Sequence, residues 1–598
     1  MYLVYVNSFY LSIYESYFAG DRTTCDRQTL VERLDLHHFQ PEIRSSSLMF
    51  VGHESRRSLR TSGLIAVWIA APLAIGLVSS CGGGVRPSGV AASSPPAPVQ
   101  NGASRATAAV ADHILTRTTL GPWWGSGCPK AGNCGCGSAE TMAEEFTCQM
   151  DELRANDIPV SVYLFDGSGW SERDSRDTGT CEGEDCCSWN LGQDVIDRLA
   201  REHVRALVHF WGGCHEPAQY ARAHAQLGGS LLGFYLDDGS SDAELQRAND
   251  FMRSVSPGDF ENIAKSHQSH EPSTTDAGLS RLANVAYVAD LANDFDGLKV
   301  GIARVLEKSR LLPAPVNELT AYDYENPVAP DEETYYRRIH WGAFQPIMAH
   351  TPFANSDPWR SEYSPDLLYA YRYWAWLHKE LTPYFLSYSR RMSEQPQLPV
   401  LLAGAEPNSM KVGEEIFVPF VTSKSGSVDF TLPAGQWVDY WDETRVVSGR
   451  LTDYPAPVGR EPVFLKLGSL IPMEVERDYT GHGTRESAGA LTILVYPSGT
   501  STFRYNDDET GSWTTFKSVA EGERLTLSAD AAPRMPLLYR VSRVLARPAS
   551  VWVSNHSVLV NQTGSLAEME SENEVIESLT DAWFYDEAKR RLIVKVVP

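Results

Sequence analysis

Between about residue 112 and residue 350, short apolar or β-branched segments alternate with amphipathic helical patterns, and this alternation constrains the fold more than any other feature of the chain. Repeated β–α units predict parallel strands, because each helix carries the chain back to the end at which the next strand begins. Eight such units in about 240 to 280 residues fit a closed (β/α)8 barrel of the α/β class. The candidate strands are Ile114–Leu120, Pro159–Phe165, Arg205–Phe210, Leu231–Leu236, Glu261–Lys265, Asn284–Ala289, Glu318–Asp323 and Pro346–His350.

Four of these candidate strands are followed by, or end in, an aspartate. The residues are Asp166, Asp237, Asp290 and Asp323. A single aspartate at a strand end is more often the N-cap of the next helix than a catalytic group. Four in one barrel would converge on the face where barrel enzymes carry out their chemistry, and we therefore treat them together as candidate site residues.

The N-terminal part has the pattern of an export signal. The apolar run Gly63–Val78 follows Arg56, Arg57 and Arg60, and small residues and Cys81 come after it. This order of basic, apolar and small residues is typical of a secretory signal, and its ending resembles a bacterial lipobox. We expect Met49 to be the true start, residues 1–48 to be a non-native extension and residues 49–81 to be a signal peptide. Cys81 would then carry a lipid that holds the exported protein at the bacterial envelope or cell surface. An uncleaved membrane anchor is the alternative.

A segment rich in Gly, Pro, Ser and Ala follows, over residues 82–111, and its composition predicts a flexible tether.

Eight further cysteines are then confined to one part of the candidate barrel. They are Cys128, Cys134, Cys136, Cys148, Cys181, Cys186, Cys187 and Cys214. An even, clustered set in an exported protein favours disulfides, whose pairing the sequence leaves open. A metal site is the alternative, but the spacing lacks the paired C-x2-C pattern of structural zinc.

The charge of the chain argues against one class of partner. There are 52 basic and 76 acidic side chains, which gives a formal net charge of −24. Nucleic acid is bound by clustered lysine and arginine, so we expect no nucleic-acid partner.

Several segments of the chain carry a further pattern. Within the candidate barrel, residues 233–237 read GFYLD, residues 287–290 read YVAD and residues 335–348 read YYRRIHWGAFQPIM. In the C-terminal half, residues 432–441 read LPAGQWVDYW, residues 460–473 read REPVFLKLGSLIPM and residues 494–508 read LVYPSGTSTFRYNDD. From about residue 115 onward, these segments resemble glycoside hydrolase family 31, the family of α-glucosidases and α-xylosidases.

The resemblance implies a domain order and a reaction. A (β/α)8 barrel over residues 112–390 would be followed by a proximal β-sandwich over residues 391–476 and a distal β domain over residues 477–598. Asp237 would be the nucleophile and Asp290 the acid/base of a retaining α-glycosidase, acting on a glycoside or oligosaccharide without metal or cofactor. The further residues predicted to bind substrate are Asp166, Asp323, His350, Trp211, Trp341 and Lys265.

The chain also departs from the family pattern, which leaves two alternatives open. Only the tether precedes the barrel, where the family usually has a β-sandwich. Asp237 is followed by Asp238-Gly239-Ser240 instead of M-N-E, and the arginine of the family's Arg-x-His is replaced by Met348. One alternative is a hydrolase for a different sugar. The other is a surface carbohydrate-binding lipoprotein with impaired catalysis, although the retained pair Asp237 and Asp290 favours an enzyme.

Overall fold

The structure is a computed structural model that describes residues 115–126, 141–165, 191–210, 217–237, 240–266, 274–288, 290–320, 328–352, 356–532 and 534–598. Eight short strands between residues 123 and 350 each precede a helix. In chain order these elements are β1 (Trp123–Gly125), α4 (Met142–Ala155), β2 (Val162–Phe165), α5 (Gly192–Glu202), β3 (Arg205–Phe210), α6 (Pro217–Leu227), β4 (Leu231–Leu236), α7 (Asp242–Val255), β5 (Ile263–Lys265), α8 (Asp276–Leu282), β6 (Val285–Tyr287), α9 (Phe295–Lys308), β7 (Ala314–Val316), α10 (Glu332–Ala343), β8 (Ala349–His350) and α11 (Pro365–Glu380). Three further helical elements are α3 (Arg117–Leu120), η6 (Gly228–Ser230) and α12 (Thr382–Glu394).

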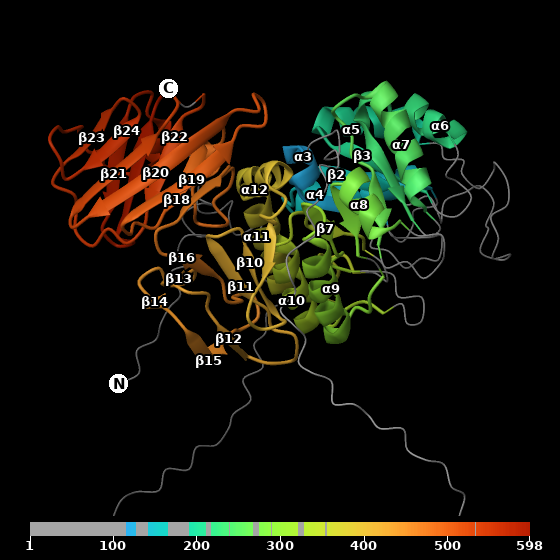
Figure 1. Cartoon of the computed structure of the whole chain (residues 1–598), viewed down its shortest axis with the longest axis horizontal. Coiled ribbons are helices and arrows are strands. Elements are labelled where there is room, and N and C mark those ends of the chain that lie inside the picture. The colour runs from blue at the N-terminus through green and yellow to red at the C-terminus, as the bar shows by residue number, and fades with distance from the viewer. Residues whose placement is uncertain are drawn as a thin grey trace, which may run out of the picture. The chain divides into compact units, whose positions relative to one another are not determined.

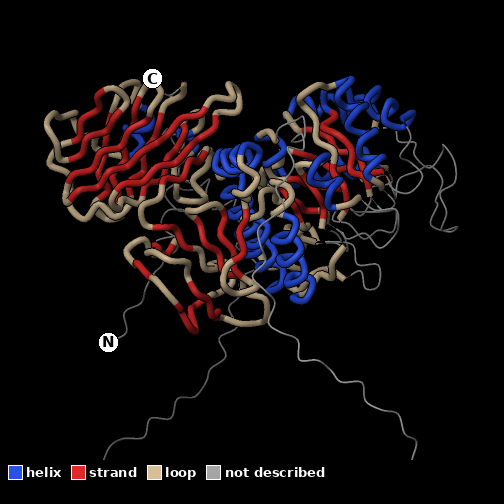
Figure 2. The backbone as a smooth tube through the Cα atoms, viewed as in Figure 1, coloured by secondary structure: helices blue, strands red, loops and turns tan. Residues whose placement is uncertain are grey.

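The eight strands form one parallel sheet in the order β7-β6-β5-β4-β3-β2-β1-β8. Just beyond β7, the amide of Leu319 donates to the carbonyl of Ala349 in β8 at 2.9 Å, which brings the two edges together. The helices surround the strands, as Figures 1 and 2 show. The predicted (β/α)8 barrel is therefore confirmed, in a nearly closed form.

Helix α7 illustrates how the sequence sets the positions of these elements. It begins at a reciprocal capping box, in which the Ser241 side chain accepts from the Glu244 amide and the Glu244 side chain accepts from the Ser241 amide. This box satisfies amides that the first helical turn leaves without partners. The cap of the helix after β4 is thus Ser241, which leaves the strand-end Asp237 available for another role.

Four strands, β2, β5, β6 and β8, are shorter than predicted, and two, β1 and β7, lie outside their predicted ranges. Residues 117–120 form the helix α3, because the Thr116 side chain caps it by accepting from the Thr119 amide. The first strand, β1, therefore lies at residues 123–125, after the predicted Ile114–Leu120. β7 lies at residues 314–316, before the predicted Glu318–Asp323. Its central Pro315 lacks a backbone donor, and this conceals the strand from pattern analysis. β3 and β4, by contrast, have the predicted bounds.

The chain after α12 is almost entirely β-structure, as predicted, and its first part is a sandwich. A six-stranded sheet faces a two-stranded ribbon, and Phe417, Phe430, Trp437, Tyr454 and Phe464 form a buried cluster. The six strands are β9 (Leu401–Ala403), β10 (Ser409–Val412), β11 (Ile416–Pro419), β13 (Trp437–Asp439), β14 (Val446–Val447) and β16 (Phe464–Lys466), and the ribbon is β12 (Ser427–Thr431) with β15 (Arg450–Pro455).

The distal part contains two five-stranded sheets. One contains β17 (Leu470–Met473), β18 (Leu491–Val495), β22 (Leu537–Val541), β26 (Arg591–Val596) and β25 (Ala582–Asp586). The other contains β19 (Thr500–Asn506), β20 (Trp513–Glu521), β21 (Arg524–Ala529), β24 (Ser557–Val560) and β23 (Val551–Ser554). The short helices η8 (Arg485–Ser487) and α13 (Glu572–Glu577) complete it. Because β17 pairs with β18, the distal sheets begin at residue 470, earlier than the predicted residue 477.

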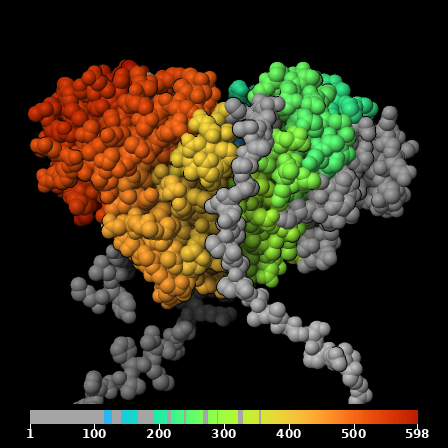
Figure 3. All heavy atoms as spheres, in the orientation of Figure 1, coloured from blue at the N-terminus to red at the C-terminus, as the bar shows by residue number. Residues whose placement is uncertain are grey.

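Helix α12 connects the barrel with the distal sheets. It contacts α3 on one side and β17 and β19 on the other. In Figure 3 the yellow segment that contains α11 and α12 separates the green barrel surface from the orange and red β-structure. Among the described residues, no helix is long and apolar enough to cross a membrane.

Candidate active site

Four neighbouring strands each place one ionisable side chain at the same end of the barrel. His209 lies on β3, Asp237 follows β4, Lys265 ends β5 and Asp290 comes shortly after β6. The four strands pair in this order, so the side chains form a row that alternates between basic and acidic groups. The carboxyl ends of barrel strands are where barrel enzymes place their catalytic groups.

Asp237 is held by both of its neighbours in the row. Its Oδ2 lies 2.8 Å from Nε2 of His209, and its Oδ1 lies 2.8 Å from Nζ of Lys265. Its backbone amide also donates to the carbonyl of Phe210 at 3.0 Å. Burial alone would raise the pKa of Asp237, but the hydrogen bonds and charges of His209 and Lys265 more than offset it, so the pKa lies well below its ordinary value. Asp237 is therefore an ionised carboxylate with a fixed orientation.

Lys265 bridges the two aspartates. Its Nζ donates to Asp237 Oδ1 at 2.8 Å and to Asp290 Oδ2 at 2.7 Å, and only 4% of its side chain is exposed. Burial would lower the pKa of Lys265, but the two carboxylates raise it above its ordinary value. Because both oxygens lie within 2.8 Å of one nitrogen, they are at most 5.5 Å apart.

Asp290 differs from Asp237 in exposure and in backbone conformation. About 31% of its side chain is exposed, against 10% for Asp237. Its φ of 27° lies in the left-handed region, which costs free energy for a residue with a Cβ atom. Conformations of this kind are retained where the position of a side chain matters.

Aromatic rings and a third acid complete the described part of this end. The rings of Tyr235 and Tyr287 stack with centroids 4.7 Å apart, next to the row. Burial and the nearby charges of Asp237, Asp290 and Glu318 raise the pKa of Tyr235, so its hydroxyl stays neutral. Glu318, just after β7, accepts a hydrogen bond from the Thr351 hydroxyl at 2.5 Å.

The other predicted residues have different positions. His350 ends β8 and is 1% exposed, with Nδ1 3.0 Å from the Tyr371 hydroxyl and Nε2 3.3 Å from the Tyr335 hydroxyl. Burial lowers its pKa to about 3, so it is neutral. With both ring nitrogens bonded inside an aromatic cluster, His350 acts as a structural residue here instead of the predicted sugar ligand.

Trp341 is a second correction. It lies on α10, is 1% exposed and packs edge-on against Phe420 of the proximal sandwich, with centroids 5.0 Å apart. Its ring therefore joins the barrel to the sandwich and does not face a sugar. The resemblance of residues 335–348 to the family pattern does not show which side of the helix Trp341 occupies.

The remaining predictions fall largely outside the described residues. Asp166, Trp211, Asp323 and Cys81 all lie there, and so do seven of the eight clustered cysteines. Cys148 on α4 is disulfide-bonded, and the bridges among the eight cysteines stay a prediction. Among the described residues, no cluster of three or more His, Cys, Asp or Glu side chains could hold a metal ion.

Two residues at this end were not predicted from the sequence. His209 lies inside the correctly predicted strand β3, and Glu318 lies in a segment assigned to a strand that begins earlier. The strand-end pattern pointed to aspartates, and the resemblance added Lys265, His350, Trp211 and Trp341, so neither His209 nor Glu318 was selected. The signal for His209 was available, because a basic residue inside an otherwise apolar barrel strand needs an acidic partner on a neighbouring strand.

Comparisons with known proteins agree with this architecture. Residues 403–471 match the glycosyl hydrolase family 31 C-terminal domain. The cycloalternan-forming enzyme from Listeria monocytogenes, solved with a pentasaccharide substrate, superposes with a TM-score of 0.64 at 16% identity, over 81% of this chain and 54% of that one. The GH31 dextranase from Flavobacterium johnsoniae, solved with glucose, gives 0.61 at 15% identity, over 81% and 70%. The resemblance to family 31 is thereby confirmed.

A curated relative is also similar in sequence. The isomaltosyltransferase of Sporosarcina globispora is 24% identical over 296 residues, which are 45% of this chain and 26% of that protein. The chain thus matches about a quarter of this relative's length and about half of the cycloalternan-forming enzyme.

Proposed function

We propose that the chain is a retaining glycosidase or transglycosylase that acts on α-linked glucosides, with Asp237 as the nucleophile and Asp290 as the acid/base. The observation that carries this proposal is the Lys265 bridge, which keeps one oxygen of each carboxylate within 5.5 Å of the other. Retaining glycosidases place their carboxyl groups about 5–5.5 Å apart, and inverting enzymes separate them by roughly 6.5–9.5 Å to admit a water.

The surroundings of the two residues support the assignment of roles. The nucleophile must be ionised, and His209 and Lys265 hold Asp237 in that form. The acid/base must exchange protons with the leaving group and with water, and Asp290 is the more exposed of the two. Different environments for two carboxylates are the usual means of giving them different roles.

The proposed reaction proceeds in two displacements. Asp237 attacks the anomeric carbon, while Asp290 gives its proton to the glycosidic oxygen and the leaving sugar departs. The resulting glycosyl ester is then broken by water or by the hydroxyl of an acceptor sugar, whose proton Asp290 takes up. Two inversions leave the product with the α configuration of the substrate.

The glycosyl ester could be broken by water, which gives hydrolysis, or by a sugar acceptor, which gives transfer. One similar protein is named as an isomaltosyltransferase and another as a dextranase. Both names concern α-linked glucose, so we propose α-glucosides and isomalto-oligosaccharides as the first substrates to examine. A different α-linked sugar remains the second choice, because Met348 stands where the family pattern has arginine.

A substrate screen with a trapping step tests the proposal. Aryl α-glycosides of several sugars, isomaltose and longer isomalto-oligosaccharides should give hydrolysis or transfer products with wild type. A 5-fluoroglycosyl fluoride of the preferred sugar should then form an ester at Asp237, located by peptide mass spectrometry, and Asp237→Ala should give none. An ester on Asp238 would move the assignment by one residue. Binding of oligosaccharides without any turnover would favour the carbohydrate-binding alternative.

We further propose that the protein is exported and anchored through a lipid on Cys81. The support is the sequence pattern of residues 56–81. Wild type should partition into detergent after expression in a bacterium with lipoprotein processing, and globomycin should cause the precursor to accumulate. Cys81→Ser should lose the lipid. A mature N-terminus upstream of Met49 would overturn this proposal.

A further inference from the structure

The alternating row places a buried cation directly between the two proposed catalytic carboxylates. Lys265 is 3% exposed as a residue, and its ammonium donates to one oxygen of each aspartate. Two ionised carboxylates this close would repel each other, and in sites where two acids share a small volume one of them normally keeps a proton. A shared ammonium removes that need, because it neutralises the pair from the centre.

This arrangement conflicts with the first chemical step. A general acid must carry a proton on its carboxyl group when the leaving oxygen departs. The ammonium, however, bonds best to the ionised form of Asp290, and it occupies Oδ2 at 2.7 Å. An empty site with Lys265 in this position therefore holds two bases and no acid.

We propose that Lys265 is a positioning residue that holds Asp237 and Asp290 together as two carboxylates in the empty site, and that it releases Asp290 when a sugar binds, so that Asp290 takes up its catalytic proton from solvent together with the substrate. This inference rests on the proposed function and adds a step to it. Lys265 keeps its contact with Asp237 throughout, and the nucleophile stays ionised.

Other ionisable groups of the described residues also lie around the pair. From β3, His209 bonds Asp237. From β4 and β6, the stacked Tyr235 and Tyr287 contribute rings beside the row, and Tyr235 is neutral. From the segment after β7, Glu318 adds another acid. Lys265 is the group that bonds one oxygen of each aspartate and so links the two carboxylates.

Proton uptake by wild type tests the inference without any substitution. The probe is a sulfur-linked isomaltose that the enzyme cannot cleave, titrated near pH 7 by calorimetry in buffers of different ionisation enthalpy. Wild type should take up close to one proton per bound sugar, and Asp290→Asn should take up almost none while still binding. Binding to wild type without proton uptake would overturn the inference.

The pH dependence of turnover gives a second test. The value of kcat/KM reports on groups of the free enzyme. For isomaltose it should fall as the pH rises from acidic values in wild type and in Lys265→Arg, which keeps the cation. In Lys265→Met this fall should move upward by at least one pH unit, because Asp290 then lies beside an unneutralised carboxylate. A glycosyl fluoride needs little protonation and should show no such movement. An unchanged profile in folded Lys265→Met would contradict the inference.

A proton titration of the unliganded proteins separates this inference from the proposed function. Between pH 5 and 8, folded Lys265→Met should bind up to one proton more than wild type. The difference should vanish when both proteins also carry Asp290→Asn, which controls for a change at His209. If wild type cleaves no α-glycoside but the extra proton is found, the proposed function fails and the coupling through Lys265 stands. If turnover is found without the extra proton, the proposed function stands and the coupling through Lys265 fails.

Discussion

Asp237 and Asp290 are the same amino acid, and their neighbours give them different chemistry. Asp237 is nearly buried and accepts from a histidine and a lysine, whereas Asp290 is about one-third exposed and has a left-handed backbone. The sequence could indicate both residues through their strand-end positions. It could not indicate the bridge between them, because that depends on where the tip of a long lysine side chain lies.

Removal of the Asp290 carboxyl should affect substrates according to their leaving groups. Asp290→Ala should lower kcat/KM for isomaltose by roughly 10²–10⁴-fold, because the glycosidic oxygen then leaves without a proton. A glycosyl fluoride should still form the ester on Asp237. Azide should speed the breakdown of that ester and give an α-glycosyl azide, the product of a second inversion, which chromatography would detect. An equal loss for both substrates, with no azide product, would remove Asp290 from the acid/base role.

A second buried acid, Glu380 on α11, should make stability depend on pH. Its Oε2 accepts from the Thr480 hydroxyl at 2.7 Å, and burial raises its pKa to about 8. Since the folded pKa exceeds the unfolded one, this group stabilises the fold at low pH, and the contribution is lost as the pH rises from about 4.5 to about 8. Glu380→Gln mimics the protonated form and should raise the urea midpoint at pH 8.

The size and the control of this effect follow from the same pKa. The gain should be of the order of a few kcal/mol at pH 8 and should disappear near pH 4.5, because one pKa unit corresponds to about 1.4 kcal/mol. Glu577→Gln, at an exposed position, should change the midpoint at neither pH. A gain for Glu380→Gln that is equal at pH 4.5 and pH 8 would show that packing, and not ionisation, is responsible.

At the scale of the elements, strand β4 sets the direction of the Asp237 side chain. Its pairing with β3 shifts register between Leu231 and Gly233, and the Phe234 amide donates to Oδ1 of Asn262 at 2.8 Å. An extra residue in a strand changes which side chains face inward beyond it. The extra residue, Leu232, therefore sets which side chains between Gly233 and Asp237 face inward.

Gly233 permits β4 to approach the chain before β5. A Cβ atom at this position would lie 1.9 Å from the carbonyl oxygen of Glu261, a backbone atom that cannot move aside alone. Gly233→Ala should therefore separate β4 from β5, destabilise the barrel by about 1–3 kcal/mol or more and lower kcat strongly. Gly229→Ala, where a Cβ atom meets nothing within 4 Å, should be nearly neutral in both assays. Equal effects in the two variants would contradict the close approach.

The elements also show where pattern analysis succeeds. Strands β3 and β4 were predicted to the residue, because continuous apolar runs bounded by polar residues are typical of buried parallel strands. β1 and β7 were misplaced, since three-residue strands carry little periodicity and Pro315 is atypical of a strand. His350 and Trp341 were assigned from similarity alone, and their burial depends on packing partners that are far away in the sequence.

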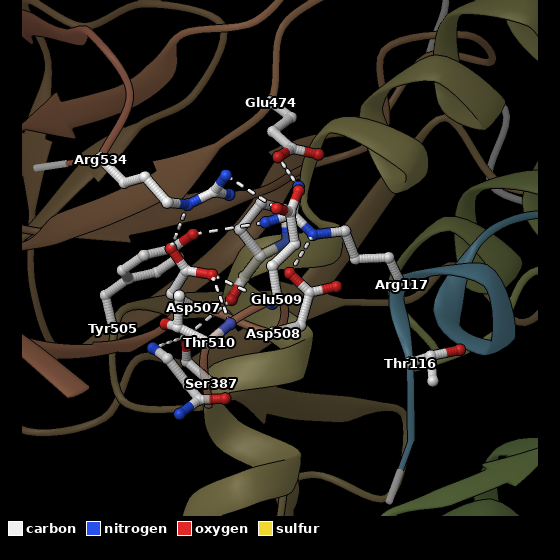
Figure 4. Close-up of polar contacts among 12 residues, drawn as sticks. Thr116, Arg117, Ser387, Glu474, Tyr505, Asp507, Asp508, Glu509, Thr510 and Arg534 are labelled. Carbon is white, nitrogen blue, oxygen red and sulfur yellow. Dashed lines mark hydrogen bonds and ion pairs between the residues drawn. The ribbon is translucent and has the colours of Figure 1, made fainter. Parts of the chain in front are cut away.

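At the scale of the whole molecule, the barrel and the distal sheets are joined by a polar cluster around Arg117. The side chain of Arg117, on the helix before β1, donates to Asp508 Oδ1 at 2.6 Å, contacts the Tyr505 hydroxyl at 3.3 Å and forms an ion pair with Glu474. Figure 4 shows these groups converging from the blue helix and from the distal strands. Asp508 and Tyr505 lie 391 and 388 residues from Arg117 in the sequence, so no local pattern could predict these contacts.

Arg117→Met should weaken this connection. The substitution keeps much of the side-chain length but leaves Asp508 and Glu474 without their shared cation, and about a quarter of the Arg117 side chain is exposed. We expect a loss on the order of 1–2 kcal/mol, smaller at high salt, with the distal sheets unfolding at lower urea than the barrel. Tryptophan fluorescence and far-ultraviolet circular dichroism should then give separate midpoints. Arg534→Met is the matched control, because Arg534 binds Asp507 and Glu509 within the distal part alone. If the control separates the two midpoints as much as Arg117→Met does, the turn at residues 507–511, and not the contact across to the barrel, determines how the distal sheets unfold.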